Sequence, residues 1–370
     1  MVPRRRPLNT VSSGLVAGAL ALALIALAPW PRSLRDHSSG DPALAVAARE
    51  ALGTEGRDRL AVAYLPPGGS PAGGLRSAGF GADARSVFEV GSVSKAFTGM
   101  LFADAIERGE ITADTTLGDV FGQRAGESAA VTLEQLATHS SGLPRLARGT
   151  VAQEIESFTR NLVRLDPYVL DREQLLAVAA RTTPDTAREP TYSNFGFALL
   201  GQALVEVTGT DYPTLVAERI VEPLGLQDTY VPPDASGVRE GDVRGRGANG
   251  LPTAAWTLDA QAPAGAVRSS VQDLATLGRA VQDGSAPGAD SARPRADLDA
   301  ESRIGWAWIT QEMPGIGAVT WHNGGTGGFS SILGFTPDGA VVAVLANTQD
   351  SVDAGLELLA PGSVGAGEGS

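Results

Sequence analysis

Residues 89–100, with the sequence EVGSVSKAFTGM, contain the only lysine of the chain. Lysine and arginine together number 29, so every other residue of this basic pair is an arginine. An arginine keeps its proton in a protein, whereas a buried lysine can lose it. The use of lysine at position 95 therefore indicates a nitrogen that works in its neutral form.

Lys95 lies three residues after Ser92, where an expected strand leads into an expected helix. Residues three apart share a helix face, so the Lys95 amine can reach the Ser92 hydroxyl. Ser92 would sit at the positive end of the helix, where its backbone N–H is free. A desolvated lysine with a lowered pKa can take the proton that makes a serine nucleophilic. The alternative interpretation is a capping serine and a surface lysine, because Ser-x-x-Lys is frequent by chance.

Hydrophobic patterning places strands near both ends of the chain. Residues 59–65 and 76–81 predict a hairpin, and residues 317–325, 329–337 and 340–347 predict an antiparallel meander. Helical patterns dominate the region between about 110 and 260. We therefore expect an α+β fold with one antiparallel sheet built from distant segments, flanked by helices, and a mostly helical second lobe. A cleft between the lobes is the expected place for a site.

Tyr192 and Asn194 precede a long apolar helix. A tyrosine near a lysine can carry a proton, because the cation favours its phenolate. The Asn194 amide offers both a donor and an acceptor to a substrate amide. The simpler interpretation of these two residues is a core tyrosine and a capping asparagine.

Residues 321–331, WHNGGTGGFSS, form a third element. Glycines inside a strand allow a ligand or another backbone to approach closely. His322 would face the cleft if Trp321 faces the core, because side chains alternate along a strand. The backbone N–H of Gly325 could join that of Ser92 in holding an oxyanion. A glycine-rich hairpin with a surface histidine is the alternative.

The order and spacing of the three elements resemble the serine β-lactamase and penicillin-binding protein superfamily. In particular they resemble the class C branch, which includes D-Ala-D-Ala carboxypeptidases and esterases. Flanking segments such as LATHSSGLP and YSNFGFALLGQALVEVTGTDY are similar to that family's, over about residues 45–350. His139, in the first of these segments, is expected to be a packing or turn residue. The resemblance implies a β-lactamase/DD-peptidase-like fold.

The resemblance also implies a role for each matching residue. Ser92 would be acylated, while Lys95 and Tyr192 would share its proton and pass it to the leaving group; which of the two is the base stays open. The substrate would lie against Asn194, His322, Asn323, Gly324 and Gly325, with the N–H groups of Ser92 and Gly325 forming the oxyanion hole. The predicted activity is that of a serine hydrolase acting on D-alanyl peptides, esters or β-lactams. The alternative is a non-catalytic protein of the same fold that binds cell-wall peptides or β-lactams.

His322 departs from the family pattern. Typical class C β-lactamases have lysine there, which gives a positive charge for the substrate carboxylate. Histidine is largely neutral near pH 7. The sequence therefore favours a peptidase or esterase, which could act on peptidoglycan stem peptides, over a dedicated β-lactamase.

Composition excludes several other classes of protein. A net charge of -13 and a pI near 4.8 argue against a nucleic-acid partner. The chain has no cysteine, and its three histidines have no metal-ligand spacing, so neither a metal nor a cofactor is expected. There is no G-x-S-x-G or H-E-x-x-H motif.

The N-terminus predicts export. Three arginines at positions 4–6 precede an apolar run over residues 14–28, which is typical of a signal peptide and almost long enough for a membrane anchor. The expected organisation is a signal peptide or anchor at 1–30, a linker at 31–40, and a catalytic domain at 41–360 with a flexible tail at 361–370. Its sheet lobe would comprise about 41–90 and 300–360, and its helical lobe about 110–260. The protein is expected to work outside the cytoplasm, secreted or attached to a membrane.

Overall fold

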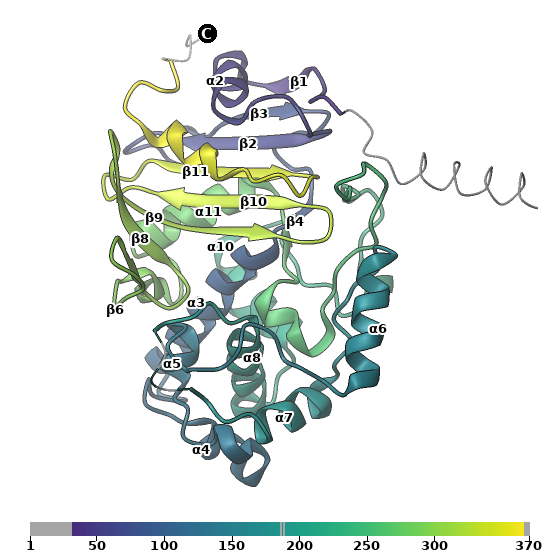
Figure 1. Ribbon diagram of the computed structural model, residues 1–370. Helices are drawn as coiled ribbons and strands as arrows, with labels where there is room; N and C mark the ends of the chain where they lie inside the picture. Colours follow the sequence, from purple (N-terminus) through teal and green to yellow (C-terminus); the bar gives the residue numbers. More distant parts are fainter. Residues whose placement is uncertain (1–31, 186, 188, 366–370) are drawn as a thin grey trace, which may run out of the picture.

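A nine-stranded antiparallel sheet is the largest layer of the molecule (Figure 1). The computed structural model describes residues 32–185, 187 and 189–365, so the predicted signal peptide or anchor at 1–30 lies outside the described residues. The strand order is β1-β3-β2-β11-β10-β9-β8-β7-β6. The strands are β1 (His37–Gly40), β2 (Leu60–Leu65), β3 (Arg76–Phe80), β6 (Ala296–Asp297), β7 (Ser302–Ile304), β8 (Ile309–Met313), β9 (Gly317–Gly325), β10 (Ser330–Phe335) and β11 (Val341–Ala346).

The central strands are buried on both faces, which explains their continuous apolar runs. In β11, Val341, Ala343 and Leu345 point into one apolar core. Val342 and Val344 point into a second core on the opposite face. This alternation follows from the two-residue repeat of a strand. The predicted hairpin (β2–β3) and meander (β9–β10–β11) are confirmed, as is the α+β class.

Helices cover both faces of the sheet and form a second lobe (Figure 1). On one face lie α2 and a 3-10 helix at Asp353–Leu359. On the other face lie α11 and α3, beyond which the helical lobe extends. The α-helices are α2 (Pro42–Leu52), α3 (Ser94–Glu107), α4 (Leu117–Phe121), α5 (Leu133–Ala137), α6 (Val151–Leu162), α7 (Arg172–Ala180), α8 (Asn194–Thr208), α9 (Tyr212–Val216), α10 (Glu222–Leu224) and α11 (Val271–Gln282).

Two expected boundaries need correction. The predicted linker at 31–40 is wrong for its second half, because His37–Gly40 forms β1 and pairs with β3. Part of the predicted tail is also packed: Val364 is buried, and the Arg76 guanidinium donates a hydrogen bond to the Gly365 carbonyl at 2.8 Å. Both segments gain their order from tertiary pairing with the sheet, which local composition does not reveal.

A small second sheet positions the start of α3. Strand β4 (Phe88–Glu89) pairs with β5 (Arg268–Ser269) and leads into a 3-10 turn at Gly91–Val93. Gly91 has φ +49°, and a Cβ there would lie 2.7 Å from the Gly325 nitrogen, so only glycine fits. Ser92 therefore lies in the turn that precedes α3, against the end of β9.

Candidate active site

Ser92 and Lys95 meet at the base of a cleft between the two lobes. The Lys95 Nζ lies 3.1 Å from the Ser92 Oγ and donates a hydrogen bond to the Ala264 carbonyl at 2.7 Å. The Lys95 side chain is fully buried. Burial, and then the charge of Arg145, lower the pKa of Lys95 well below its usual range. A neutral amine donating to Ala264 keeps a lone pair that can accept the Ser92 proton.

Tyr192 covers the other side of the lysine. The Lys95 Nζ lies 4.8 Å from the centre of the Tyr192 ring. Burial raises the pKa of Tyr192 above its usual value of 10, although the Ser92 hydroxyl and the Arg145 charge oppose the shift. The phenol therefore stays protonated near neutral pH. Of these two groups, Lys95 is the one whose neutral, proton-accepting form is favoured.

His139 holds this tyrosine in place. Its ring centre lies 4.5 Å from that of Tyr192, and its Nδ1 accepts a hydrogen bond from the Ser193 N–H at 3.2 Å. His139 has φ +60°, which is uncommon outside glycine. The expectation of a packing or turn residue is confirmed, and the contacts show that the packing is against Tyr192.

A cavity of about 550 Å³ opens above Ser92. Six of the predicted site residues line it: Ser92, Tyr192, Asn194, Asn323, Gly324 and Gly325. Asn194 begins α8, which Ser193 caps. The Asn194 Nδ2 lies 3.5 Å from the Tyr168 hydroxyl, and within the described chain its buried Oδ1 has no hydrogen-bond partner. Asn194 itself lines the cavity, so its side chain is a candidate for contact with a ligand there.

The end of β9 fits closely against the turn that contains Ser92. A Cβ on Gly324 would lie 2.1 Å from the Val90 carbonyl and 2.8 Å from the Ser92 nitrogen. The glycine at 324 is therefore required for the approach of the two backbones. This contact brings the Gly325 backbone and the Ser92 backbone to the same wall of the cavity.

His322 lies behind the cavity wall and not on it. The ring is 1% exposed, and Nδ1 donates to the Asn323 carbonyl at 2.6 Å. Burial, and then the charge of Lys95, lower the pKa of His322 to about 3. His322 does face away from Trp321, which packs against the opposite core, as strand alternation predicts. However, the ring is buried and does not line the cavity above Ser92, contrary to the expected side-chain contact with a substrate.

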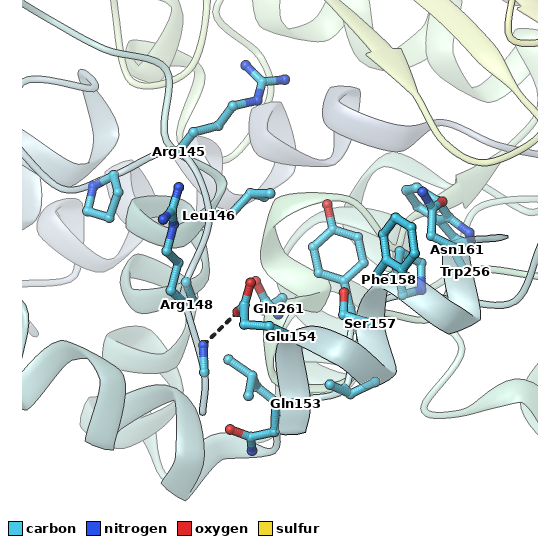
Figure 2. A pocket seen from close by; sticks show the side chains of 17 residues that line it. Arg145, Leu146, Arg148, Gln153, Glu154, Ser157, Phe158, Asn161, Trp256 and Gln261 are labelled. Atoms are coloured by element: carbon cyan, nitrogen blue, oxygen red, sulfur yellow. Dashed lines mark hydrogen bonds between the residues drawn. The ribbon is translucent and has the colours of Figure 1, made fainter. Parts of the chain in front are cut away.

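Three further residues of the cleft went unnoticed in the sequence. Arg145, Tyr168 and Trp256 line the cavity, and the Arg145 guanidinium lies 5.0 Å from the Tyr192 ring centre. Among the described residues, no carboxylate pairs with Arg145. All three lie in irregular segments of the helical lobe, where no periodic pattern marks a site residue. Figure 2 shows Arg145 extending away from the other labelled side chains of a neighbouring cavity.

Neither a metal cluster nor a membrane-spanning helix is found in the described part of the chain. Over residues 32–185, 187 and 189–365, no cluster of histidine, aspartate and glutamate has the geometry to hold a metal ion. None of the helices in these ranges is both long and apolar enough to cross a bilayer.

A serine beside a buried lysine, in a cleft between an antiparallel sheet and a helical lobe, defines the class of β-lactamase-fold serine hydrolases. The chain belongs to the Beta-lactamase family, whose model matches residues 72–360. The superfamily resemblance predicted from the sequence is thereby confirmed.

Curated relatives and solved structures agree with this assignment. Penicillin-binding protein 4 of Amycolatopsis lactamdurans is 28% identical over 296 residues, which cover 73% of this chain and 74% of that protein. A beta-lactamase of Escherichia coli strain K12 is 29% identical over 313 residues, covering 71% and 76%. The fold matches a D-stereospecific amidohydrolase from Streptomyces sp. with a TM-score of 0.71 and 23% identity, over 86% of this chain and 98% of that chain. It also matches a class C beta-lactamase with a TM-score of 0.69 and 17% identity, over 85% and 92%.

Proposed function

We propose that this protein hydrolyses an ester or amide through an acyl-enzyme on Ser92. The observation that carries the proposal is the buried Lys95 amine, 3.1 Å from the Ser92 Oγ and with its pKa lowered well below the usual value. A neutral amine at this distance can accept the hydroxyl proton as the oxygen attacks. The proposal thus takes Lys95 as the base.

The proposed reaction has an acylation half and a deacylation half. The Ser92 oxygen bonds to the substrate carbonyl carbon while its proton moves to the Lys95 nitrogen. The negative oxygen of the tetrahedral intermediate is held by the N–H groups of Ser92 and Gly325. The bond to the leaving group then breaks, and that group takes the Tyr192 phenolic proton, which Lys95 replaces. Water finally attacks the acyl-enzyme by the same route and releases the acid and Ser92.

The charges on the cleft walls affect which substrates can bind. His322 is neutral and enclosed, while Asp353 lines the cavity and accepts a hydrogen bond from the Asn323 Nδ2 at 3.0 Å. A carboxylate placed at the end of β9 would therefore meet no cation and would be repelled by Asp353. Arg145 supplies positive charge on the opposite wall, beside Asn194. These features support esters or peptides without a carboxylate next to β9.

Names of relatives fit this range of substrates. A D-alanyl-D-alanine-carboxypeptidase/endopeptidase of Escherichia coli strain K12 is 31% identical over 173 residues, which cover 44% of this chain. Together with the exported N-terminus that we expect, this supports D-alanyl peptides of the cell wall as natural substrates, with a further residue and not a free carboxylate next to β9. The competing function is a protein that binds such peptides without turning them over.

The covalent step can be tested by intact-mass measurement after incubation with an activated ester and, separately, with a penicillin. We expect an acyl adduct on the wild-type chain and none on Ser92→Ala. Ser351→Ala, which changes an exposed serine at the cavity rim, should acquire the same adduct. A full adduct on Ser92→Ala would refute the assignment of the nucleophile. An adduct that forms but never turns over on any substrate would favour the binding protein.

The substrate class can be tested by comparing the rates at which different substrates are hydrolysed. We expect a short-chain ester or a C-terminally amidated D-Ala-D-Ala peptide to be hydrolysed faster than a chromogenic cephalosporin, because the cephalosporin carries a carboxylate. The reverse order would refute the interpretation of a β9 wall without positive charge.

A further inference from the structure

Helix α6 has its apolar side turned outward. Val151, Ile155, Phe158 and Leu162 are spaced four, three and four residues apart, so they lie on one face of the helix. Their exposed fractions are 77%, 62%, 69% and 70%. None of the helix's residues is buried. A surface helix of a globular protein normally presents such a face to the core, so this face requires an occupant.

The polar side of α6 faces the protein. Gln153 and Ser157 are half-buried and line a cavity of about 730 Å³ between the helix and the segment after Pro144 (Figure 2). The Arg160 Nε donates to the Asp166 carbonyl at 2.7 Å, which fixes this side inward. The helix is therefore held in an orientation that leaves Val151, Ile155 and Leu162 free, while Phe158 also borders the cavity. The apolar face continues into exposed Val163 and Leu165.

The chain enters the described structure beside the same helix. The Arg32 Nη2 donates to the Ala248 carbonyl at 3.3 Å. Arg164, two residues after the end of α6, packs against Gly247 of the same loop, and its carbonyl accepts from the Ala254 N–H at 3.0 Å. Figure 1 shows α6 on the side of the molecule where the described chain begins.

The short stretch of chain between the apolar run of residues 14–28 and Arg32 limits how far that run can lie from this side of the molecule. Four residue steps separate Ala28 from Arg32, which span at most about 14 Å. Helix α6 has 12 residues and extends about 18 Å from the loop that Arg32 contacts. A bilayer that receives the apolar run would therefore pass within about 14 Å of Arg32, which lies near the C-terminal end of α6.

We propose that the apolar face of α6 lies in the interface of a lipid bilayer, beside an N-terminal segment that anchors the chain in the same bilayer. An amphipathic helix in this setting buries its apolar face by about 5–10 Å among headgroups and acyl chains. The cavity beside α6 shares Arg145, Leu146, Tyr168 and Trp256 with the cleft above Ser92. Docking of α6 thus places the approach to the active site next to the membrane surface.

The absence of cysteine permits a direct test on the full chain. Single-cysteine variants Ile155→Cys, Phe158→Cys and Leu162→Cys are labelled with an environment-sensitive fluorophore and reconstituted into phosphatidylcholine vesicles. Glu156→Cys is the matched control, because Glu156 neighbours Ile155 but lies off the apolar face. We expect nitroxide-labelled lipids to quench the three apolar-face labels several-fold more than the control, and aqueous iodide to show the opposite order.

Three results would overturn the proposal. Equal iodide quenching at all four positions means that the face stays in water. Protection from iodide that disappears when the protein is diluted in the membrane identifies a second copy of the chain as the occupant. Protection without quenching by nitroxide lipids identifies docking within the protein, such as by residues 14–28. Because the substituted side chains are highly exposed, the cysteine variants are expected to fold like the wild-type protein.

Discussion

Two buried clusters of ionisable groups lie close to the nucleophile, and they are built on opposite rules. The ion-pair cluster holds the Arg268 guanidinium between the carboxylates of Glu89 and Asp242, at 3.0 and 2.7 Å, although burial raises the pKa of Glu89. The lysine cluster comprises Lys95, His139, Tyr192 and His322, and no carboxylate of the described chain pairs with it. Burial lowers the pKa of its lysine and both histidines and raises that of its tyrosine, so all four groups favour their neutral forms.

The difference shows that the two clusters serve different tasks: the ion-pair cluster holds fixed charges, and the lysine cluster is suited to proton transfer. The ion-pair cluster joins β4 to β5, and Glu89 also accepts from the Trp256 N–H at 3.0 Å, so it fixes the strand that leads to Ser92. A permanent charge pair suits this structural task. Proton transfer needs a group that is neutral at rest, and the lysine cluster provides that by desolvation alone.

The largest expected effect breaks the lysine cluster's function. Lys95→Met removes the proposed base, and Lys95→Arg replaces it with a group that cannot lose its proton. Both should slow acylation of Ser92 by about 10²- to 10⁴-fold, the usual contribution of a positioned acid or base. Stopped-flow measurement of the ester burst gives this rate, with thermal unfolding as the control for folding. A Lys95→Met protein that acylates at the wild-type rate would show that Tyr192 is the base.

Stability should respond in the opposite way for the two clusters. Arg268→Met leaves Glu89 and Asp242 buried without a cation and is expected to cost about 3–5 kcal/mol in unfolding free energy. Lys95→Met should cost nothing or stabilise, because the unfolded chain gains a proton on Lys95 below pH 10.5 that the folded chain does not hold. Urea unfolding at pH 7 compares them. Equal losses for both variants would contradict the distinction between the clusters.

The effect that is smallest at neutral pH is on acid stability. The pKa of His322 is about 3 in the folded chain and 6.5 for a histidine in water, so below pH 6.5 the unfolded chain binds a proton that the folded chain excludes. This histidine should reduce stability by up to about 1.4 kcal/mol per pH unit between 6.5 and 3. His322→Gln should flatten the curve of unfolding free energy against pH in that range. Parallel curves for His322→Gln and wild type would mean that the ring is protonated in the folded protein.

Local chemistry made part of this molecule predictable. Ser92 and Lys95 are only three positions apart, so their pairing follows from the local geometry of one turn and the start of one helix. The central strands can be recognised from their apolar runs. By contrast, the burial of His322 depends on packing with residues distant in the sequence, such as Tyr192, whose ring centre lies 6.4 Å away. Arg145 reaches the cleft from a loop. Such contacts join distant parts of the chain, and no local pattern encodes them.

The short edge strands escaped notice for a similar reason. His37–Gly40 is polar, and it is a strand because its backbone pairs with β3. Strands β6 and β7 have two and three residues, which is too short for an alternating pattern to stand out. These segments are strands because their backbones pair with a neighbouring strand at the edge of the sheet, and not because of a preference of their side chains.

The single ε-amine of this chain has a practical consequence for spectroscopy. Growth on isotopically labelled lysine would place one side-chain nitrogen label in the whole molecule, at the Lys95 Nζ. Its resonance would need no assignment, and its chemical shift would report the protonation of that amine directly, before a substrate arrives and during the lifetime of the proposed acyl-enzyme.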